Sequence, residues 1–346
     1  RTIKRVTTPF RESVAIMAPE STPLPLIEAR ALRKLYGPHL ALEDINLAIP
    51  HGATGLLGPN GAGKSTLFKC ILGLIKATSG DGHVLGHDMR TEGHLIRSKI
   101  GYMPEYDSLD PGLNAIDQVR YSGELLGMNS SVATQRAHEV LEYVGLKDQR
   151  YRKIETFSTG MKQATKLACA LIHDPELLIC DEPTNGLDQR ARDFMLQTLR
   201  RTVTEGGRSV IMSSHVMDDV QEVCDRIVMI HKGKIVVEGK IDELVSQVES
   251  EIEISVWGGA SEMESQLVSM GMLVRRLGRN MRISKSSEET YSKIMEAASL
   301  CGVQVRKMSD YEPDLEDIFL LIMDKLGEEV KGTDELMTDE HRGLSV

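Results

Sequence analysis

The N-terminal part of the chain alternates apolar and polar positions in the way that is typical of strands. Residues 26–36 and 39–49 each keep this alternation, and Gly37 and Pro38 interrupt it between them. A period of two places one face of a strand in a core and the other in solvent, and a Gly-Pro pair favours a turn. The pattern therefore predicts a β-hairpin with Tyr36 at its tip.

Helical spacings and short apolar runs follow one another beyond this hairpin. Apolar residues recur every three to four positions in residues 112–150, which predicts helices. Ser158 and Thr159 are good helix N-caps, so another helix is expected from there to Asp174-Pro175. Such alternation indicates an α/β fold. Short strands are predicted at Leu56–Leu57, His83–Leu85, Ile100–Met103, Leu177–Cys180 and Ser209–Ser213.

The last hundred residues predict a strand, a helix, two strands, a helix, a strand and a closing helix. The order βαββαβ is that of a ferredoxin-like domain. We therefore expect a small C-terminal α/β accessory domain over residues 249–327. In chain order, its elements are predicted at Glu251–Trp257, Glu262–Met270, Met272–Leu277, Asn280–Ser284, Glu288–Leu300, Val303–Lys307 and Leu315–Leu326.

A glycine-rich segment lies between the first of the short strands and a helical pattern over Leu67–Leu74. Gly58, Gly63, Lys64 and Ser65 have the spacing G-x-x-x-x-G-K-[ST]. In this arrangement glycines let consecutive backbone N–H groups surround a phosphate at the positive end of the following helix. The lysine would reach the β- and γ-phosphates, and the serine hydroxyl would hold Mg²⁺. The segment therefore predicts a nucleotide-binding loop.

Two carboxylates and a histidine come directly after other predicted strands. Asp181 and Glu182 follow the apolar strand at 177–180, and His215 follows the strand at 209–213. In α/β folds, ligands bind at the carboxyl edge of the parallel strands. One carboxylate can orient Mg²⁺ through water while its neighbour polarises the attacking water. We expect a hydrolytic site at this edge, with the histidine in contact with phosphate.

Composition narrows the class of protein. The 346 residues suggest a main domain with an accessory one, and a formal charge of −10 argues against a broad nucleic-acid-binding surface. The five cysteines have no metal-binding spacing and are expected to be buried thiols of a reducing cytosol. The longest strictly apolar runs, Leu167–Ile172 and Ile318–Met323, have six residues each. A membrane helix needs about twenty.

Six short motifs follow one another along the chain, GPNGAGKST, GYMPE, FSTGM, LLICDEP, NGLD and SSH. In this order they resemble the motifs of the nucleotide-binding subunits of ABC transporters. The resemblance covers about residues 26–245 and implies an ATPase that uses ATP and Mg²⁺. It also implies an α/β P-loop core with an N-terminal antiparallel β subdomain and a helical insertion at about residues 106–165. The motifs are GPNGAGKST for Walker A, GYMPE at the Q-loop, FSTGM at the signature, LLICDEP for Walker B, NGLD at the D-loop and SSH at the switch histidine.

The resemblance implies a role for each motif residue. Tyr36 would stack on adenine, although its spacing fits an edge aromatic that covers the hairpin equally well. Glu182 would be the general base, and His215 would contact the γ-phosphate. Together with Lys64, these two form the expected catalytic set. The ATP-binding set is Tyr36, Gly58, Pro59, Asn60, Gly61, Ala62, Gly63, Lys64, Ser65 and Thr66, and the metal set is Ser65, Asp181 and Glu105.

In this family the signature closes over ATP that is bound to the opposite subunit. Ser158, Thr159 and Gly160 would therefore act in trans, and Asp188 marks the D-loop. The expected partners are a second ATP-binding subunit in a homodimer and a separate transmembrane permease subunit. A lone subunit should be nearly inactive. The expected location is the cytoplasm, at the inner face of the cell membrane through the membrane partner.

Two positions depart from the usual family pattern. Glu105 stands where the family usually has Gln, and Phe157–Met161 replaces Leu-Ser-Gly-Gly-Gln. Both variants resemble those of exporters of the multidrug, sodium and nodulation-factor type, as does the small C-terminal domain. We expect Glu105 to link the nucleotide state to the membrane partner. The alternative is that it caps the helical insertion through its loop backbone.

The expected organisation has four parts. They are a disordered leader at 1–21, an ABC-type ATP-binding domain at 22–248, the accessory domain at 249–327, and a disordered acidic tail at 328–346.

Two other functions are weighed against that of an exporter ATPase. A soluble ABC-type ATPase that acts on ribosomes or nucleic acid would normally carry two cassettes, coiled coils or zinc modules, whereas this sequence has a single Walker A and a single signature. Binding to nucleic acid is not expected at a charge of −10. A non-catalytic protein that binds nucleotide only for regulation is disfavoured, because the residues expected for hydrolysis are all present. They are Lys64, Asp181, Glu182 and His215.

Overall fold

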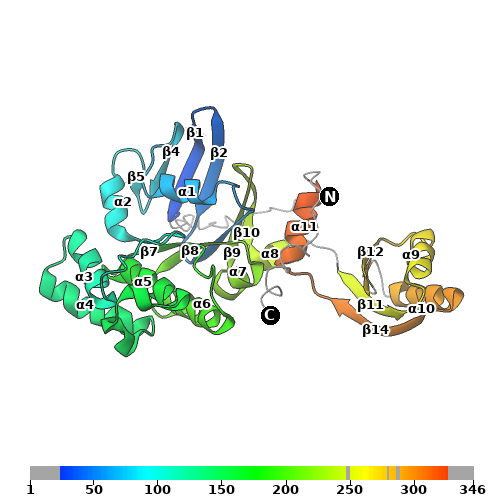
Figure 1. The fold of residues 1–346 in the computed structure, drawn as a ribbon. Helices are drawn as coiled ribbons and strands as arrows, with labels where there is room; N and C mark the ends of the chain where they lie inside the picture. Colours follow the sequence, from blue (N-terminus) through cyan, green and yellow to red (C-terminus); the bar gives the residue numbers. More distant parts are fainter. Residues whose placement is uncertain (1–23, 247–249, 279, 286–288, 326–346) are drawn as a thin grey trace, which may run out of the picture.

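The computed structural model describes residues 24–246, 250–278, 280–285 and 289–325. In these residues the strands form three sheets (Figure 1). The leader expected at 1–21 and the tail expected at 328–346 lie outside the described residues.

An antiparallel sheet contains the predicted hairpin. Tyr36 pairs with His39 at the tip, and Ile27 pairs with Ile49 at the other end, so the register follows the apolar alternation. The strand predicted at His83–Leu85 is Ser79–Val84 in the structure, so it begins earlier and ends one residue sooner than predicted. The two-residue strand after it was not predicted, because it is too short to show a pattern. The strand order is β2-β1-β4-β5, with β1 Ile27–Tyr36, β2 His39–Ile49, β4 Ser79–Val84 and β5 His87–Asp88.

A second, largely parallel sheet carries the functional strand ends. Its order is β10-β9-β3-β8-β7-β6, and only β10 runs antiparallel to its neighbour. Every residue of β3, β7 and β8 is buried, which explains why none of these strands alternates apolar and polar residues. The strands are β3 Ala53–Leu57, β6 Ile100–Met103, β7 Leu177–Asp181, β8 Ser209–Ser214, β9 Arg226–His231 and β10 Lys234–Lys240.

Helices surround this sheet (Figure 1). The helical spacing at 112–150 corresponds to two helices, which begin at side-chain caps on Asn114 and Asn129. Ser158 caps the next helix, as predicted, because its Oγ accepts from the Met161 N–H. The helices are α1 Lys64–Ile71, α2 Gly93–Lys99, α3 Ala115–Leu125, α4 Ser130–Tyr143, α5 Thr159–Leu171, α6 Gln189–Thr204, α7 Met217–Val223 and α8 Ile241–Val245, with 3₁₀ turns at Lys147–Tyr151 and Ile154–Thr156.

The C-terminal α/β part has its own antiparallel sheet of order β12-β13-β11-β14. Its core is separate and includes Ile254, Met263, Met281 and Ile294, all completely buried. The element order is the predicted one, with β11 Glu251–Trp257, α9 Ala260–Ser269, β12 Val274–Leu277, β13 Asn280–Ser284, α10 Glu289–Cys301, β14 Gln304–Tyr311 and α11 Leu315–Lys325.

The closing helix α11 packs differently from the rest of this part. Leu315 and Ile318 belong to the hydrophobic core of the large sheet, where α11 lies against α7 and α8. Figure 1 shows α11 between the two parts of the molecule. The sequence assigned this helix to the accessory unit of residues 249–327. Its apolar side is instead buried against the large part.

Candidate functional site

The glycine-rich loop connects the end of β3 to the start of α1, as its spacing predicted. Gly63 has φ 113°, a left-handed conformation that favours glycine. A Cβ atom on Gly58 would lie 2.2 Å from the carbonyl oxygen of Ile230. The loop therefore needs glycine at both positions, and it leads directly into the first turn of α1, whose backbone N–H groups have no partner within the helix.

A cleft of about 470 Å³ lies over this loop. Most of the predicted site residues line it, although they come from the hairpin, the loop, the end of β6 and the end of β7. His39 and Ala41 were missed. The pairing of His39 with Tyr36 across the hairpin tip is the signal that could have found them. The predicted lining residues are Tyr36, Pro59, Asn60, Gly61, Ala62, Gly63, Lys64, Ser65, Thr66, Glu105, Asp181 and Glu182.

Lys64, Glu182 and His215 form one connected cluster at the edge of the sheet. Lys64 Nζ donates to the carbonyl oxygen of Gly58 at 2.6 Å and lies 3.4 Å from Glu182 Oε1. His215 Nδ1 lies 2.8 Å from Glu182 Oε2. Lys64 and Glu182 are buried, whereas the His215 side chain is 41% exposed. The structure thus brings the three predicted catalytic side chains together.

The hydrogen bond between Glu182 and His215 shifts the pKa values of these two side chains in opposite directions. Burial would raise the pKa of Glu182, but the hydrogen bond with His215 and the charge of Lys64 outweigh burial and lower it. The same hydrogen bond raises the pKa of His215 against the effect of burial. Glu182 is therefore held as a carboxylate, the form that can accept a proton from water.

Asp181 is held by Ser213, a residue whose role the sequence did not reveal. The Ser213 hydroxyl donates to Asp181 Oδ1 at 2.6 Å and accepts from the Glu182 N–H at 2.9 Å. These two bonds fix both carboxylate residues relative to β8. The position of Ser213 just before Ser214 and His215, at the predicted strand end, is the signal that could have identified it.

Oxygen ligands suited to Mg²⁺ face the same cleft. Ser65, Asp181 and Glu105 line it, and hydroxyl and carboxylate oxygens are the ligands that Mg²⁺ prefers. Among the described residues, no group of three or more His, Cys, Asp or Glu side chains is arranged to hold a metal ion. Mg²⁺ commonly binds through one or two carboxylates plus substrate phosphates and water. The side chains present fit that mode.

The signature and the D-loop residue do not line the cleft. Ser158 caps α5, and Asp188 caps α6 by accepting from the Ala191 N–H at 2.8 Å. A Cβ atom on Gly160 would lie 3.0 Å from the Ala191 Cβ, so the starts of these two helices are packed together. The signature and the D-loop therefore lie together at the starts of α5 and α6, outside the lining of their own chain's cleft.

The contacts of Tyr36 fit both interpretations of this residue, a ring that stacks on adenine and an edge aromatic that covers the hairpin. It lines the cleft with its side chain partly exposed, and Lys34 Nζ lies 5.0 Å from the centre of its ring. An exposed ring at the mouth of a cleft is available for stacking.

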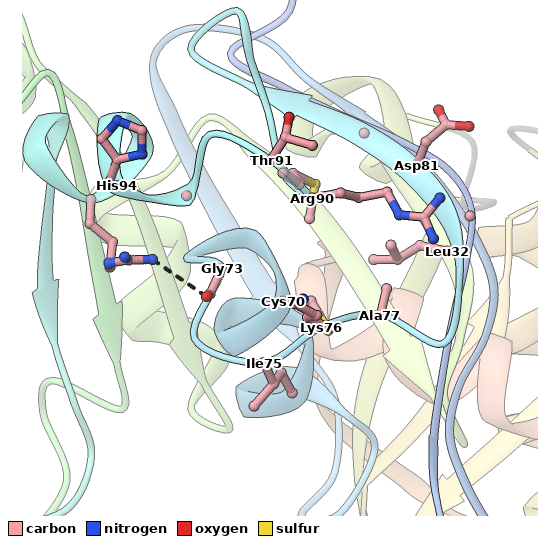
Figure 2. Close-up of a pocket in the computed structure, with 15 residues that line it drawn as sticks. Leu32, Cys70, Gly73, Ile75, Lys76, Ala77, Asp81, Arg90, Thr91 and His94 are labelled. Carbon is pink, nitrogen blue, oxygen red and sulfur yellow. Dashed lines mark hydrogen bonds between the residues drawn. The ribbon is translucent and has the colours of Figure 1, made fainter.

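A second cavity, of about 450 Å³, lies beside the C-terminal end of α1 and the segment that follows it (Figure 2). None of the predicted site residues lines it. Arg97 donates to the carbonyl oxygens of Leu72 and Gly73 at the end of α1, so its charge already has partners there.

Comparisons with known proteins agree with this geometry. The sequence profile of the family described as "ABC transporter" matches residues 42–185. The linearmycin resistance ATP-binding protein LnrL of Bacillus subtilis is 36% identical over 306 residues, which cover 85% of this chain and 97% of that protein. This chain belongs to the ABC transporter ATP-binding proteins. It is an ATPase subunit, and it has the α/β ABC ATPase fold with an antiparallel β subdomain and an additional C-terminal α/β sheet.

Other members of the family are similarly related to this ABC subunit. The daunorubicin/doxorubicin resistance ATP-binding protein DrrA of Streptomyces peucetius is 30% identical, over 87% of this chain and 93% of that protein. The Nod factor export ATP-binding protein I of Bradyrhizobium diazoefficiens is also 30% identical, over 85% of this chain and 95% of that protein.

Solved structures match the large part of the ABC subunit. A dimeric structure of a bacterial ABC transporter cassette is 27% identical, with a TM-score of 0.58 over 62% of this chain and 98% of that chain. A dimeric post-hydrolysis structure of the same cassette, bound to ADP and Pi, matches equally well. In the described part of the subunit, no helix combines the length and apolar character needed to cross a membrane.

Proposed function

We propose that this subunit powers an ABC exporter by binding and hydrolysing ATP against a separate transmembrane permease. The observation that carries the proposal is the Lys64, Glu182 and His215 cluster beside the phosphate loop. Relatives named for drug resistance and for Nod factor export support the direction of transport. The subunit would act at the cytoplasmic face of the membrane through its permease.

Each residue of the cleft has a proposed role. Lys64 and Thr66 bind phosphate, and the backbone of Gly58–Gly63 surrounds it. Glu182 takes a proton from the attacking water, and His215 contacts the γ-phosphate while it orients Glu182. The proposed role of Tyr36 is to stack on adenine, for which its place at the mouth of the cleft is the support.

Ser65, Asp181 and Glu105 are proposed to hold Mg²⁺. The ion neutralises charge on the phosphates when it is bound. Ser213 keeps Asp181 oriented through its hydrogen bond to Oδ1. Glu105 also lies in the loop that follows β6, and we assign to that loop the contact that links nucleotide state to the permease.

A second ATP-binding subunit completes each site. Ser158, Thr159 and Gly160 lie with Asp188 at the adjoining starts of α5 and α6 and do not line the cleft of their own chain, which supports a role against ATP that is bound to the partner. The dimeric structures of a related cassette also support this arrangement. We propose a homodimer with two shared sites.

The domain assignment is part of the same proposal. Residues 22–248 form the ATP-binding domain, with a helical insertion at about 106–165, and residues 249–327 form the accessory domain, whose closing helix α11 packs its apolar side on the ATP-binding domain. The strand order β12-β13-β11-β14 with βαββαβ connectivity supports a ferredoxin-like fold for the accessory sheet and its helices α9 and α10.

The substitution Glu182→Gln tests the proposed function. The amide cannot act as the base, so ATP turnover should fall by about 10²- to 10⁴-fold while ATP binding is retained. Turnover is measured by phosphate release, and binding by equilibrium titration with ATP. Glu176→Gln, directly before β7 as Glu182 is directly after it, and half exposed in a pair with Lys99, is the matched control. Near-normal turnover by Glu182→Gln would exclude this carboxylate as the base.

A further inference from the structure

Lys166 is a buried lysine with an unusual set of partners. It lies on α5 and is only 5% exposed. Its Nζ donates to three consecutive backbone carbonyl oxygens, those of Pro104 at 2.6 Å, Glu105 at 3.0 Å and Tyr106 at 3.3 Å. An ammonium group has three donors, so this one is fully used by the loop that follows β6.

The partners of Lys166 lie about sixty residues away along the chain, in the loop that places Glu105 in the nucleotide cleft. One helical turn earlier on α5, Lys162 forms an ion pair with Asp107 of the same loop at 3.2 Å. This second pair is largely exposed, and such pairs contribute little. The buried bonds of Lys166 are therefore the main polar connection between α5 and this loop.

Helix α5 also begins at the signature. Ser158 caps its first turn, and Lys166 lies two turns further along the same helix. A single α-helix transmits displacement as a nearly rigid element. A shift of the signature at the start of α5 therefore reaches the carbonyl oxygens of residues 104–106, because the ammonium of Lys166, midway along the same helix, is bonded to them.

Burial of the Lys166 ammonium makes its hydrogen bonds to the loop costly to break. Desolvation lowers the pKa of Lys166, while Asp107 and other nearby acidic groups oppose the change. An ammonium that leaves its carbonyl partners inside the protein loses strong charge-assisted hydrogen bonds and finds no water to replace them. The helix and the loop are therefore held in one relative position and are expected to move together.

We propose that Lys166 is a positioning residue that couples the two nucleotide sites of the dimer. This inference depends on the proposed function, in which Glu105 serves the site of its own subunit and the signature serves the site of the partner. Because Lys166 joins the two, closure of the signature over the partner's ATP sets the position of Glu105 in its own site. Each site then senses the other through α5.

The substitution Lys166→Met tests this coupling, because methionine keeps an unbranched chain but has no donors. In the full-length dimer, wild-type hydrolysis should show a Hill coefficient for ATP that approaches about 2. Lys166→Met should lower it toward about 1 and raise the Mg²⁺ concentration for half-maximal activity about fivefold. ATP binding by the separated subunit should not change. Lys162→Met, the same substitution one turn earlier, should behave as wild type.

The double variant with Glu105→Gln distinguishes a positioning role of Lys166 from a general loosening of the structure. If Lys166 acts through Glu105, then Lys166→Met should add little to the altered Mg²⁺ dependence of Glu105→Gln. If Lys166→Met does not fold, as judged by its thermal unfolding, Lys166→Gln replaces it. Glutamine keeps two donors on a shorter chain and should give an intermediate Hill coefficient.

The outcomes separate this inference from the proposed function. An active wild-type dimer whose Hill coefficient and Mg²⁺ dependence are unchanged by Lys166→Met, or by a folded Lys166→Gln, overturns the coupling role alone. Additive effects of Lys166→Met and Glu105→Gln on Mg²⁺ dependence overturn it as well. A wild-type protein that does not hydrolyse ATP, or normal turnover by Glu182→Gln, overturns the proposed function instead.

Discussion

Glu182 has a backbone conformation that few residues other than glycine adopt. Its φ is 50°, in the left-handed region, where a side chain usually costs energy. Its N–H donates to Ser213, and its carboxylate contacts Lys64 and His215. These partners hold the strained residue in place, and the conformation directs the carboxylate along the sheet edge toward the phosphate loop.

The pair of His215 and Glu182 makes stability depend on pH. The pKa of His215 is raised above its ordinary value of 6.5, mainly by the hydrogen bond to Glu182. The pair therefore contributes fully to stability below about pH 6.5, and this contribution is lost as the pH rises through the raised pKa of the folded state. The lowered pKa of Glu182 matters only in acid, where its contribution is lost as the pH falls.

We therefore expect His215→Gln to destabilise the subunit more at about pH 6 than at about pH 9. The measurement is urea unfolding of the wild type and the variant at both pH values. His94→Gln, an exposed histidine on α2, is the control for the change of residue type. A difference in unfolding free energy that is equal at both pH values, or larger at the higher one, contradicts the pairing.

At the scale of elements, the contact between β6 and α5 depends on a glycine. A Cβ atom on Gly101 would lie 2.2 Å from the carbonyl oxygen of Ala170. No L side chain fits there without separating the strand from the helix. This close approach is also what brings the end of β6 within reach of Lys166.

Gly101→Ala should therefore destabilise the subunit by about 1–3 kcal/mol and lower the midpoint of its thermal unfolding. It should also alter the Mg²⁺ dependence of hydrolysis, because the loop after β6 carries Glu105. Gly112→Ala is the control, since its nearest neighbour is a flexible side-chain oxygen of Asp110 at 3.3 Å. Equal unfolding midpoints for the two variants would show that β6 and α5 can separate at no cost.

At the scale of the whole molecule, the signature does not line the nucleotide cleft that contains the phosphate loop of its own chain. Ser158 and Lys64 therefore belong to different sites if two subunits face each other with two-fold symmetry. Subunits of Ser158→Arg and subunits of Lys64→Ala should each be inactive alone, because every site then lacks one half.

A mixture of these two variants should regain up to about a quarter of the wild-type ATPase rate. Random pairing makes half of the dimers mixed, and each mixed dimer has one intact site of two. Coupling between the sites reduces this value further. Phosphate release is measured as a function of the mixing ratio. A mixture that stays as inactive as its two components at every protein concentration is incompatible with shared sites.

Helix α11 connects the two parts of the subunit. Leu315 and Ile318 pack on the large part, while Asp317 accepts from Arg282 on β13 at 2.5 Å and from Tyr311 on β14 at 2.8 Å. Asp317 is only 8% exposed, so these bonds are shielded from solvent. One side of α11 therefore belongs to each part, and the helix sets their relative position.

Local patterns in the sequence determined most of the elements and the chemistry of the loop. The alternation at 26–36 and 39–49 predicted the hairpin, because period two specifies which face of a strand is buried. The spacing of Gly58, Gly63 and Lys64 predicted the phosphate loop, because its backbone conformation needs glycine at fixed positions. Such features depend on neighbours in sequence, so they can be read without a tertiary structure. The roles of these residues stay predictions.

Tertiary structure alone decided which distant residues meet. Ser213 with Asp181, Lys166 with residues 104–106, and α11 with α7 each join segments far apart in sequence. A lone serine or lysine has no periodicity that names its partner, and an apolar helix face shows that it is buried without showing against what. These contacts depend on how the elements dock, and docking is set by the packing of the whole core.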